Sequence, residues 1–169
     1  GAIAPTLSLD PLRQTLEARG WRLEPPAFTV PNLQLNDPTA LTFTKRNATL
    51  VLTQDDYNLC LLKGDCCIAT AGTATEQFVG LGKPAIAIPG NGPQFTPAFA
   101  EAQTRLLGPS VILVEQPDKV ASIVQQLLRD PDWLQLIAEN GFQRMGQPGA
   151  AKRIANCLLE RFQGFEHRT

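Results

Sequence analysis

The sequence has few of the residues on which common catalytic devices depend. Of its 169 residues one is histidine, one is methionine and one is tyrosine, and only 7% are aromatic. The single histidine, His167, is the third residue from the end of the sequence, a place where chains commonly fray. A Ser-His-Asp or Cys-His arrangement would have to use this residue. We therefore expect that no catalytic step depends on an imidazole base of this chain.

Cysteine is also scarce, and its spacing fits neither a disulfide scaffold nor a zinc site. The four cysteines are Cys60, Cys66, Cys67 and Cys157, two of which are adjacent. Zinc sites need pairs of cysteines or histidines separated by short spacers, which this set does not provide. We expect no metal, and thiols that stay reduced in the cytoplasm.

The chain has neither an excess of charge of one sign nor a long apolar run. Lysine and arginine number 15 and aspartate and glutamate 16, for a net charge of -1. This balance gives no electrostatic reason to expect a nucleic-acid partner. No apolar run approaches the roughly 18 residues that a membrane-spanning helix needs, and the first residues lack the pattern of a signal peptide. We predict a cytoplasmic protein that binds no nucleic acid.

Positive charge is concentrated near the C-terminal end, in Arg144, Lys152, Arg153, Arg161 and Arg168. Such a cluster is usually a solvated helix face. The alternative is contact with an acidic partner or with an anionic membrane, which would make the protein peripheral to the inner membrane.

Short apolar runs alternate with helical patterns over the last two thirds of the chain. Apolar runs at 65–70, 85–89 and 111–114 are each followed by a helical pattern, at about 73–81, 97–107 and 117–129, and two more helical patterns follow at 131–145 and 149–162. Continuously apolar strands that alternate with helices indicate a parallel sheet covered on both faces. The first third of the chain has a different pattern. It predicts a helix at 10–19, a proline-rich loop at 24–40 and a tight hairpin of strands at 41–44 and 48–53. A short helix follows residues 54–56. We predict one Rossmann-like α/β domain over residues 1–169, with helices on both faces of its parallel sheet.

The turn Thr70-Ala-Gly-Thr-Ala-Thr-Glu76 follows the first of these apolar runs. In open α/β sheets, ligands bind beyond the carboxyl ends of the strands. Gly72 permits a close approach of the backbone and a positive φ. Thr73, Ala74 and Thr75 would offer their amides at the positive end of a helix dipole. The turn therefore predicts a phosphate or diphosphate site.

Glu76 has two interpretations that its spacing alone does not separate. Thr73 and Glu76 are three residues apart, as in a capping box, in which both side chains bind the backbone of the first helical turn. Alternatively, the Glu76 carboxylate accepts two hydrogen bonds from a vicinal diol such as that of ribose.

A longer stretch of sequence around this turn resembles a known protein family. Residues 67–90, Cys-Ile-Ala-Thr-Ala-Gly-Thr-Ala-Thr-Glu-Gln-Phe-Val-Gly-Leu-Gly-Lys-Pro-Ala-Ile-Ala-Ile-Pro-Gly, resemble the donor-binding half of GT-B glycosyltransferases, above all the lipid A disaccharide synthase group. Residues 144–155, Arg-Met-Gly-Gln-Pro-Gly-Ala-Ala-Lys-Arg-Ile-Ala, are similar to the closing helical segment of that group. The resemblance covers most of residues 50–160. It implies the C-terminal half of a GT-B fold and hexosyl transfer from a UDP-sugar to a lipid or sugar acceptor, in lipid biosynthesis.

The resemblance also implies roles for particular residues. Gly72, Thr73 and Thr75 would face the diphosphate of the UDP-sugar, and Glu76 would hold the ribose diol. The uracil would lie along the stretch Thr53-Gln54-Asp55, where a backbone amide and carbonyl could read the base edge. The donor sugar would face the loop after the second parallel strand, at Asn91, Gly92, Gln94 and Phe95. In this loop the chain departs from the pattern of relatives that handle N-acetylglucosamine, so the donor sugar stays open. A turn at Asn91 and Gly92, and a Phe95 that docks the next helix, are the alternatives.

In GT-B enzymes the acceptor site and the usual catalytic base belong to the N-terminal domain. This sequence opens at what resembles the end of a strand in the C-terminal domain. We therefore expect a fragment that is inactive alone, from an inverting glycosyltransferase that needs no cofactor beyond its UDP-sugar donor. Its catalytic residues are unknown. Two alternatives stay open: half of a UDP-sugar 2-epimerase, for which residues 90–96 lack ionisable groups, and a non-catalytic module of the same fold.

Overall fold

The computed structural model describes residues 1–90, 92–93 and 95–166, the last four of these without their side chains. The chain divides into two compact units, Gly1–Gly64 and Asp65–Thr169. Sequence patterns predict one domain, whereas each unit in the structure has a three-stranded sheet of its own. The units are therefore described separately.

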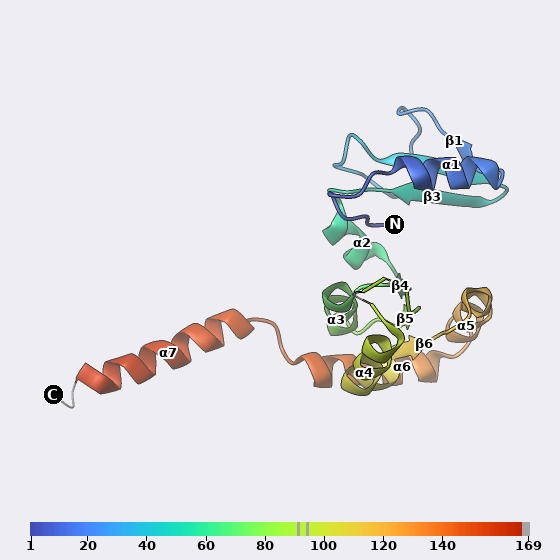
Figure 1. The fold of residues 1–169 in the computed structure, drawn as a ribbon. Helices are drawn as coiled ribbons and strands as arrows, with labels where there is room; N and C mark the ends of the chain where they lie inside the picture. The colour runs from blue at the N-terminus through green and yellow to red at the C-terminus, as the bar shows by residue number, and fades with distance from the viewer. Residues whose placement is uncertain (91, 94, 167–169) are drawn as a thin grey trace. The chain divides into compact units, whose positions relative to one another are not determined.

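The first unit is built on a small antiparallel sheet. Its strands pair in the order β1-β2-β3, and the predicted hairpin is confirmed, because β2 and β3 pair in register from Leu41 opposite Leu52 to Lys45 opposite Ala48. The predicted helices at both ends of the unit are confirmed as well (Figure 1). The elements are α1 (Asp10–Ala18), β1 (Arg22–Leu23), β2 (Leu41–Lys45), β3 (Ala48–Leu52) and α2 (Tyr57–Lys63).

The second unit follows the predicted alternation of strands and helices. Its three strands are parallel in the order β4-β5-β6, with Cys67 opposite Ala85 and Ala85 opposite Val111. The elements are β4 (Cys67–Ala69), α3 (Gly72–Gly80), β5 (Ala85–Ala87), α4 (Pro97–Leu107), a 3-10 turn η1 (Gly108–Ser110), β6 (Val111–Leu113), a second turn η2 (Pro117–Lys119), α5 (Val120–Leu127), α6 (Pro131–Met145) and α7 (Ala150–Glu166).

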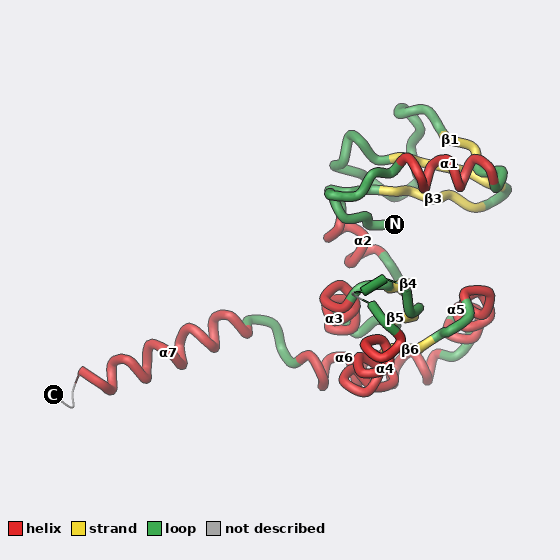
Figure 2. The backbone as a smooth tube through the Cα atoms, in the orientation of Figure 1, coloured by secondary structure: helices red, strands yellow, loops and turns green. Residues whose placement is uncertain are grey.

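Two apolar clusters cover the two faces of the parallel sheet. Ala85 and Ala87 of β5 pack in one cluster with Val79 of α3 and with Ala100 and Leu107 of α4. Ile86 packs in the other cluster with Val114, which follows β6, Leu127 of α5 and Ile137 of α6. Figure 2 shows the short strands with helices on both sides. The prediction of an α/β unit with a parallel sheet flanked by helices is confirmed at this level.

Helices α3 and α6 approach each other closely at a glycine. Gly141 of α6 is buried, and a Cβ atom there would lie 2.4 Å from the carbonyl oxygen of Val79. Real Cβ atoms do not come so close to backbone. The absence of a side chain at Gly141 therefore sets the distance between these two helices.

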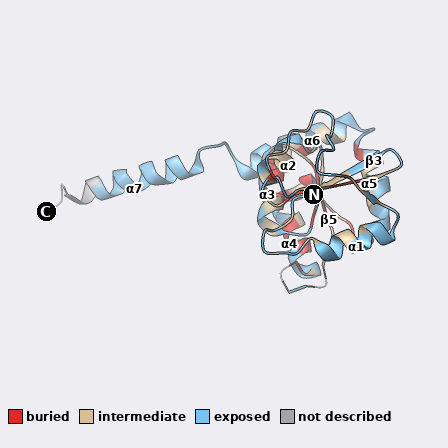
Figure 3. Ribbon diagram, turned by 90° about the horizontal axis from the view of Figure 1, so that it is seen from above, coloured by how far each residue is buried: buried red, intermediate tan, exposed pale blue. Residues whose placement is uncertain are grey.

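Helix α7 has no buried residue among its described side chains, which extend from Ala150 to Phe162. Figure 3 shows it exposed over the residues whose side chains are described. Among the residues that the structure describes, no helix combines the length and the apolar character needed to cross a membrane.

Candidate functional site

The turn that the sequence singles out lies between β4 and α3, at the carboxyl edge of the parallel sheet. Ala71 precedes the helix in an extended conformation, and the helix begins at Gly72. Ala71 makes no side-chain cap hydrogen bond. Since the first amides of any helix lack an acceptor within it, the start of α3 can donate hydrogen bonds to an anion.

Of the two interpretations of Glu76, the capping box with Thr73 is wrong. The helix starts one residue before Thr73, so Thr73 is a helical residue and not the N-cap. Glu76 is partly buried in the body of α3, one turn after Gly72. The Glu76 carboxylate therefore does not make the capping hydrogen bond that the spacing suggested.

The side chain of Thr75 is buried and forms its hydrogen bond with the residue that precedes α3. The Thr75 side chain is completely buried, and its hydroxyl donates a hydrogen bond to the carbonyl oxygen of Ala71. By contrast, Thr73 is exposed and Ala74 is partly buried. Of the three residues expected to meet a diphosphate, Gly72 and Thr73 have surface there and Thr75 has none.

Gly72 is approached closely by another helix of the same unit. The Phe99 ring of α4 lies 3.2 Å from the position that a Cβ of Gly72 would take, and the Gln103 side-chain amide donates to the Gly72 carbonyl at 3.0 Å. Gly72 is not among the described residues with positive φ, so the helix does not use the conformation that glycine permits there. The close approach that glycine permits here is made by Phe99.

Gln103 carries an unusual polar atom next to this turn. Its side chain is 4% exposed, and its Oε1 atom is buried with no hydrogen-bond partner among the described residues. A buried acceptor without a partner costs free energy, on the order of 1–3 kcal/mol. The start of α3 is therefore held in place by a side chain whose own hydrogen bonds are incomplete.

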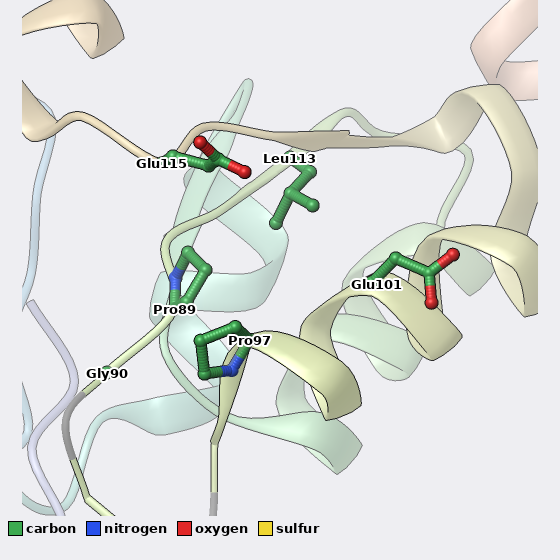
Figure 4. Close-up of a pocket in the computed structure, with 6 residues that line it drawn as sticks. All are labelled: Pro89, Gly90, Pro97, Glu101, Leu113 and Glu115. Carbon is green, nitrogen blue, oxygen red and sulfur yellow. The ribbon is translucent and has the colours of Figure 1, made fainter.

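A hollow of about 470 Å³ opens beyond the carboxyl ends of β5 and β6. Its polar side chains are Glu101, which pairs with Arg105 at 3.0 Å, and Glu115, which is exposed. Figure 4 shows Leu113 between the two glutamates in this view, with Pro89 and Pro97 below it. The lining residues are Pro89, Gly90, Pro97, Glu101, Leu113 and Glu115.

Sequence reasoning missed both glutamates of the hollow. Glu115 directly follows the third apolar run, so the rule that ligands bind beyond the carboxyl ends of strands could have identified it. Glu101 occupies the second turn of a helix that the sequence predicts correctly, but nothing in its spacing distinguishes it from a solvated residue.

Helix α4 has the hollow on one side and the start of α3 on the other. At 100° per residue, Pro97 and Glu101 share one face, and Phe99 and Gln103 share a face on the opposite side. The loop before α4 also contributes to the core, since Phe95 is 5% exposed and its ring lies 5.6 Å from that of Phe99. Phe95 thus packs against the next helix, which is the alternative to its predicted contact with the donor sugar.

The rest of the predicted sugar-facing loop is described only in part. Gly92 is exposed, and no described atom beyond its own residue and its two chain neighbours lies within 4 Å of a Cβ placed on it. Asn91 and Gln94 lie outside the described residues.

Thr53 and Gln54 belong to the first unit, where they bind a buried carboxylate. Asp37 accepts hydrogen bonds from the Thr53 hydroxyl at 2.7 Å, the Gln54 amide at 2.8 Å, and both the amide and the hydroxyl of Thr39. The Thr53 amide donates to the Gly1 carbonyl, and the Thr53 carbonyl accepts from the amide of residue 3. Three of the backbone groups expected to read a uracil edge, the Thr53 amide and carbonyl and the Gln54 amide, are thus hydrogen-bonded within the protein.

A second carboxylate, Asp56, completes this network. The sequence predicts that residues 54–56 cap the following helix, and Asp56 does precede α2, but it makes no side-chain cap hydrogen bond. Its carboxylate instead accepts from the amides of Asn36 at 2.7 Å and Asp37 at 3.0 Å. The two aspartates therefore tie the proline-rich loop to the end of β3.

Hydrogen bonds lower the pKa of both carboxyl groups. Burial acts to raise the pKa of Asp37, but the bonds from Thr39, Thr53 and Gln54 outweigh it and hold this pKa well below its ordinary value. The bond from the Asp37 amide lowers the pKa of Asp56, against the opposing effect of burial. Both groups are thus stabilised as anions in the folded protein.

We expect the first unit to lose stability as the solution becomes acidic. A carboxylate whose pKa is lowered by folding contributes stability that is complete above the unfolded pKa of about 4, and that is lost as the pH falls through the folded pKa. The urea midpoint reported by Trp21 fluorescence in a Trp133→Phe variant should therefore be lower at about pH 3 than at about pH 5. A midpoint that is equal or higher at the lower pH would contradict the roles of Asp37 and Asp56.

The second unit has the broad architecture of Rossmann-like α/β proteins, with an exposed helix start and a hollow at the carboxyl edge of its parallel sheet. Within the described ranges, no three histidine, cysteine, aspartate or glutamate side chains are grouped so that they could hold a metal ion. Comparison of the chain with protein-family models, curated proteins and solved structures finds no match in any of the three.

Proposed function

We propose that the second unit binds a nucleotide sugar, with the diphosphate at the start of α3. In this proposal the chain is the donor half of a glycosyltransferase that moves a hexose from a UDP-sugar to a lipid or sugar acceptor. One observation carries it: a nine-residue helix begins at Gly72, directly beyond the carboxyl end of a parallel strand, after an extended Ala71 that makes no side-chain cap. The resemblance of residues 67–90 to GT-B donor domains supports the same ligand.

The start of α3 would act on the diphosphate through backbone groups. The amides of Gly72, Thr73 and Ala74 are the first of the helix, and they carry the positive end of its dipole. An anion bound there gains hydrogen bonds without requiring a cationic side chain. In a displacement at the anomeric carbon, the same amides would stabilise the departing diphosphate.

Glu76 would bind the ribose. It lies one helical turn from Gly72 and is partly buried, and no cap holds its carboxylate. A carboxylate offers two oxygens, each of which can accept a hydrogen bond from one hydroxyl of a vicinal diol. This position lets a single ligand contact the first-turn amides and Glu76 together.

The hollow suits a sugar better than a phosphate. Glu101 and Glu115 repel phosphate oxygens and accept hydrogen bonds from hydroxyl groups. Because the hollow and Gly72 lie on different sides of α4, a ligand that reaches both would pass the N-terminal end of that helix. We therefore propose that the hexose points toward the hollow.

A non-catalytic α/β unit is the second candidate. This candidate is favoured because groups that a UDP-sugar would need already form hydrogen bonds within the protein. The Thr75 hydroxyl donates to the Ala71 carbonyl. The Thr53 amide donates to the Gly1 carbonyl, and the Gln54 amide donates to the Asp37 carboxylate. A chain that kept the fold without the ligand would show such contacts.

Titration of the chain with UDP and with inorganic pyrophosphate separates these candidates. We expect UDP to bind with a Kd in the millimolar range and to shift the backbone amide NMR signals of Gly72, Thr73 and Ala74. Glu76→Gln should weaken UDP about tenfold and leave pyrophosphate within about twofold, because only UDP has a ribose.

Glu139→Gln is the matched control, since Glu139 is an exposed glutamate on α6 of the same unit. It should leave both affinities unchanged. An equal loss of UDP and pyrophosphate binding in Glu76→Gln would exclude the ribose role of Glu76. No amide shift at a UDP concentration on the order of 10 mM would favour the non-catalytic unit.

A further inference from the structure

Helix α7 presents an apolar face that nothing in the described structure covers. The helix comprises Ala150–Glu166, and four large apolar side chains among its described residues are at least half exposed. These are Ile154 at 61%, Leu158 at 51%, Leu159 at 59% and Phe162 at 67%. So much exposed apolar surface on one helix indicates a binding surface.

The apolar residues of α7 gather on one side of the helix. Ile154, Leu158 and Phe162 are spaced four residues apart and therefore lie above one another. Ala151 and Ala155 fall on the same side, and Leu159 falls at its border. The resulting face is broader than the narrow stripe by which two helices pair in a coiled coil.

Basic side chains flank this face on both sides. At 100° per residue, Lys152 lies just beyond Leu159, and Arg161 lies just beyond Ile154 on the opposite border. Neither makes an ion pair among the described residues. Arg153 points elsewhere, since it donates to the carbonyl oxygens of Gln147 and Pro148 before the helix.

The segment also differs in charge from the rest of the chain. Residues 150–169 contain four basic and two acidic residues, whereas the whole chain has a net charge of -1. Everything before residue 150 is therefore net acidic. Electrostatic attraction to this segment in particular therefore favours an anionic partner.

From these observations we infer that α7 lies in the plane of an anionic lipid surface. The face around Leu158 would enter the boundary between headgroups and acyl chains, and Lys152 and Arg161 would extend to lipid phosphates. A second copy of the chain fits this surface less well, because it would bring the same basic flanks together. This inference does not depend on nucleotide-sugar binding.

Sedimentation of the 169-residue chain with lipid vesicles tests the inference. Vesicles of phosphatidylcholine with about 30% phosphatidylglycerol should bind the chain, and vesicles of phosphatidylcholine alone should bind it about tenfold more weakly. Leu158→Gln should reduce binding to the anionic vesicles about tenfold. Lys152→Gln combined with Arg161→Gln should reduce it by a similar factor, and added salt should have the same effect.

Asn156→Gln is the matched control, because Asn156 is exposed on the polar face of the same helix. All the substitutions alter exposed residues, so circular dichroism should show an unchanged fold. The inference is overturned if the chain binds neither kind of vesicle, binds both equally, or loses binding equally in Leu158→Gln and Asn156→Gln. It is also overturned if the chain forms a dimer that Leu158→Gln dissociates while vesicles stay unbound.

Discussion

Replacing Asp37 with alanine is expected to lower the free energy of unfolding of the first unit by about 3 kcal/mol. Asp37 is 5% exposed and accepts hydrogen bonds from the Thr53 hydroxyl, the Gln54 amide and two groups of Thr39. Alanine removes the acceptor and leaves these donors without partners, which costs more than the loss of a solvated hydrogen bond.

Urea unfolding followed by tryptophan fluorescence measures this effect, because each unit contains one of the two tryptophans. In a Trp133→Phe background the signal comes from Trp21 and reports the first unit. Asp55→Ala is the control, since Asp55 is an exposed aspartate that follows Gln54 and whose backbone amide, which alanine keeps, donates to Asp37. It should change stability by less than about 0.5 kcal/mol. Equal effects of the two substitutions would show that the Asp37 network contributes little.

Gly141→Ala is expected to destabilise the second unit by about 3 kcal/mol or more. The new methyl group would lie 2.4 Å from the Val79 carbonyl oxygen, a backbone atom that cannot rotate away. Helices α3 and α6 would have to separate, which would disturb the packing of Val79 and Ile137, both completely buried. The measurement is urea unfolding reported by Trp133 in a Trp21→Phe background.

Gly80→Ala tests whether the expected loss of stability in Gly141→Ala comes from the close contact with Val79 and not from the added methyl group alone. Gly80 is also a helical glycine at the contact between α3 and α6, but a Cβ there would lie 3.4 Å from the side chain of Met145, an ordinary distance. Alanine also favours the helix over glycine. The stability of Gly80→Ala should therefore equal or slightly exceed that of the parent, and a loss as large as that of Gly141→Ala would contradict the steric explanation.

The architecture of the second unit follows from local patterns in the sequence. The runs at 65–70, 85–89 and 111–114 are short and apolar and have glycine or proline within three residues of both ends, so each predicts a buried strand without knowledge of its neighbours. The helices between them begin and end within a few residues of the predicted positions. Covered parallel sheets are among the folds for which such patterns suffice.

Contacts between distant residues could not be predicted in this way. Spacing alone suggested that Thr73 caps α3 and that Asp56 caps α2, but the helix begins at Gly72 and the Asp56 carboxylate binds the backbone of a loop 19 and 20 residues away. Phe99 makes the close approach to Gly72 for which the sequence predicted a ligand, and it does so on the side where a Cβ of Gly72 would lie. The division into two units also has no local marker, because nothing in the composition around Gly64 resembles a linker.

The position of α4 makes it a mechanical link. One of its faces forms a wall of the hollow through Pro97 and Glu101, while Phe99 and Gln103 on the opposite side hold the first residue of α3. A molecule that enters the hollow and displaces α4 must also disturb the amides at Gly72. Occupancy at either place would thus alter affinity at the other, and by the same factor in both directions.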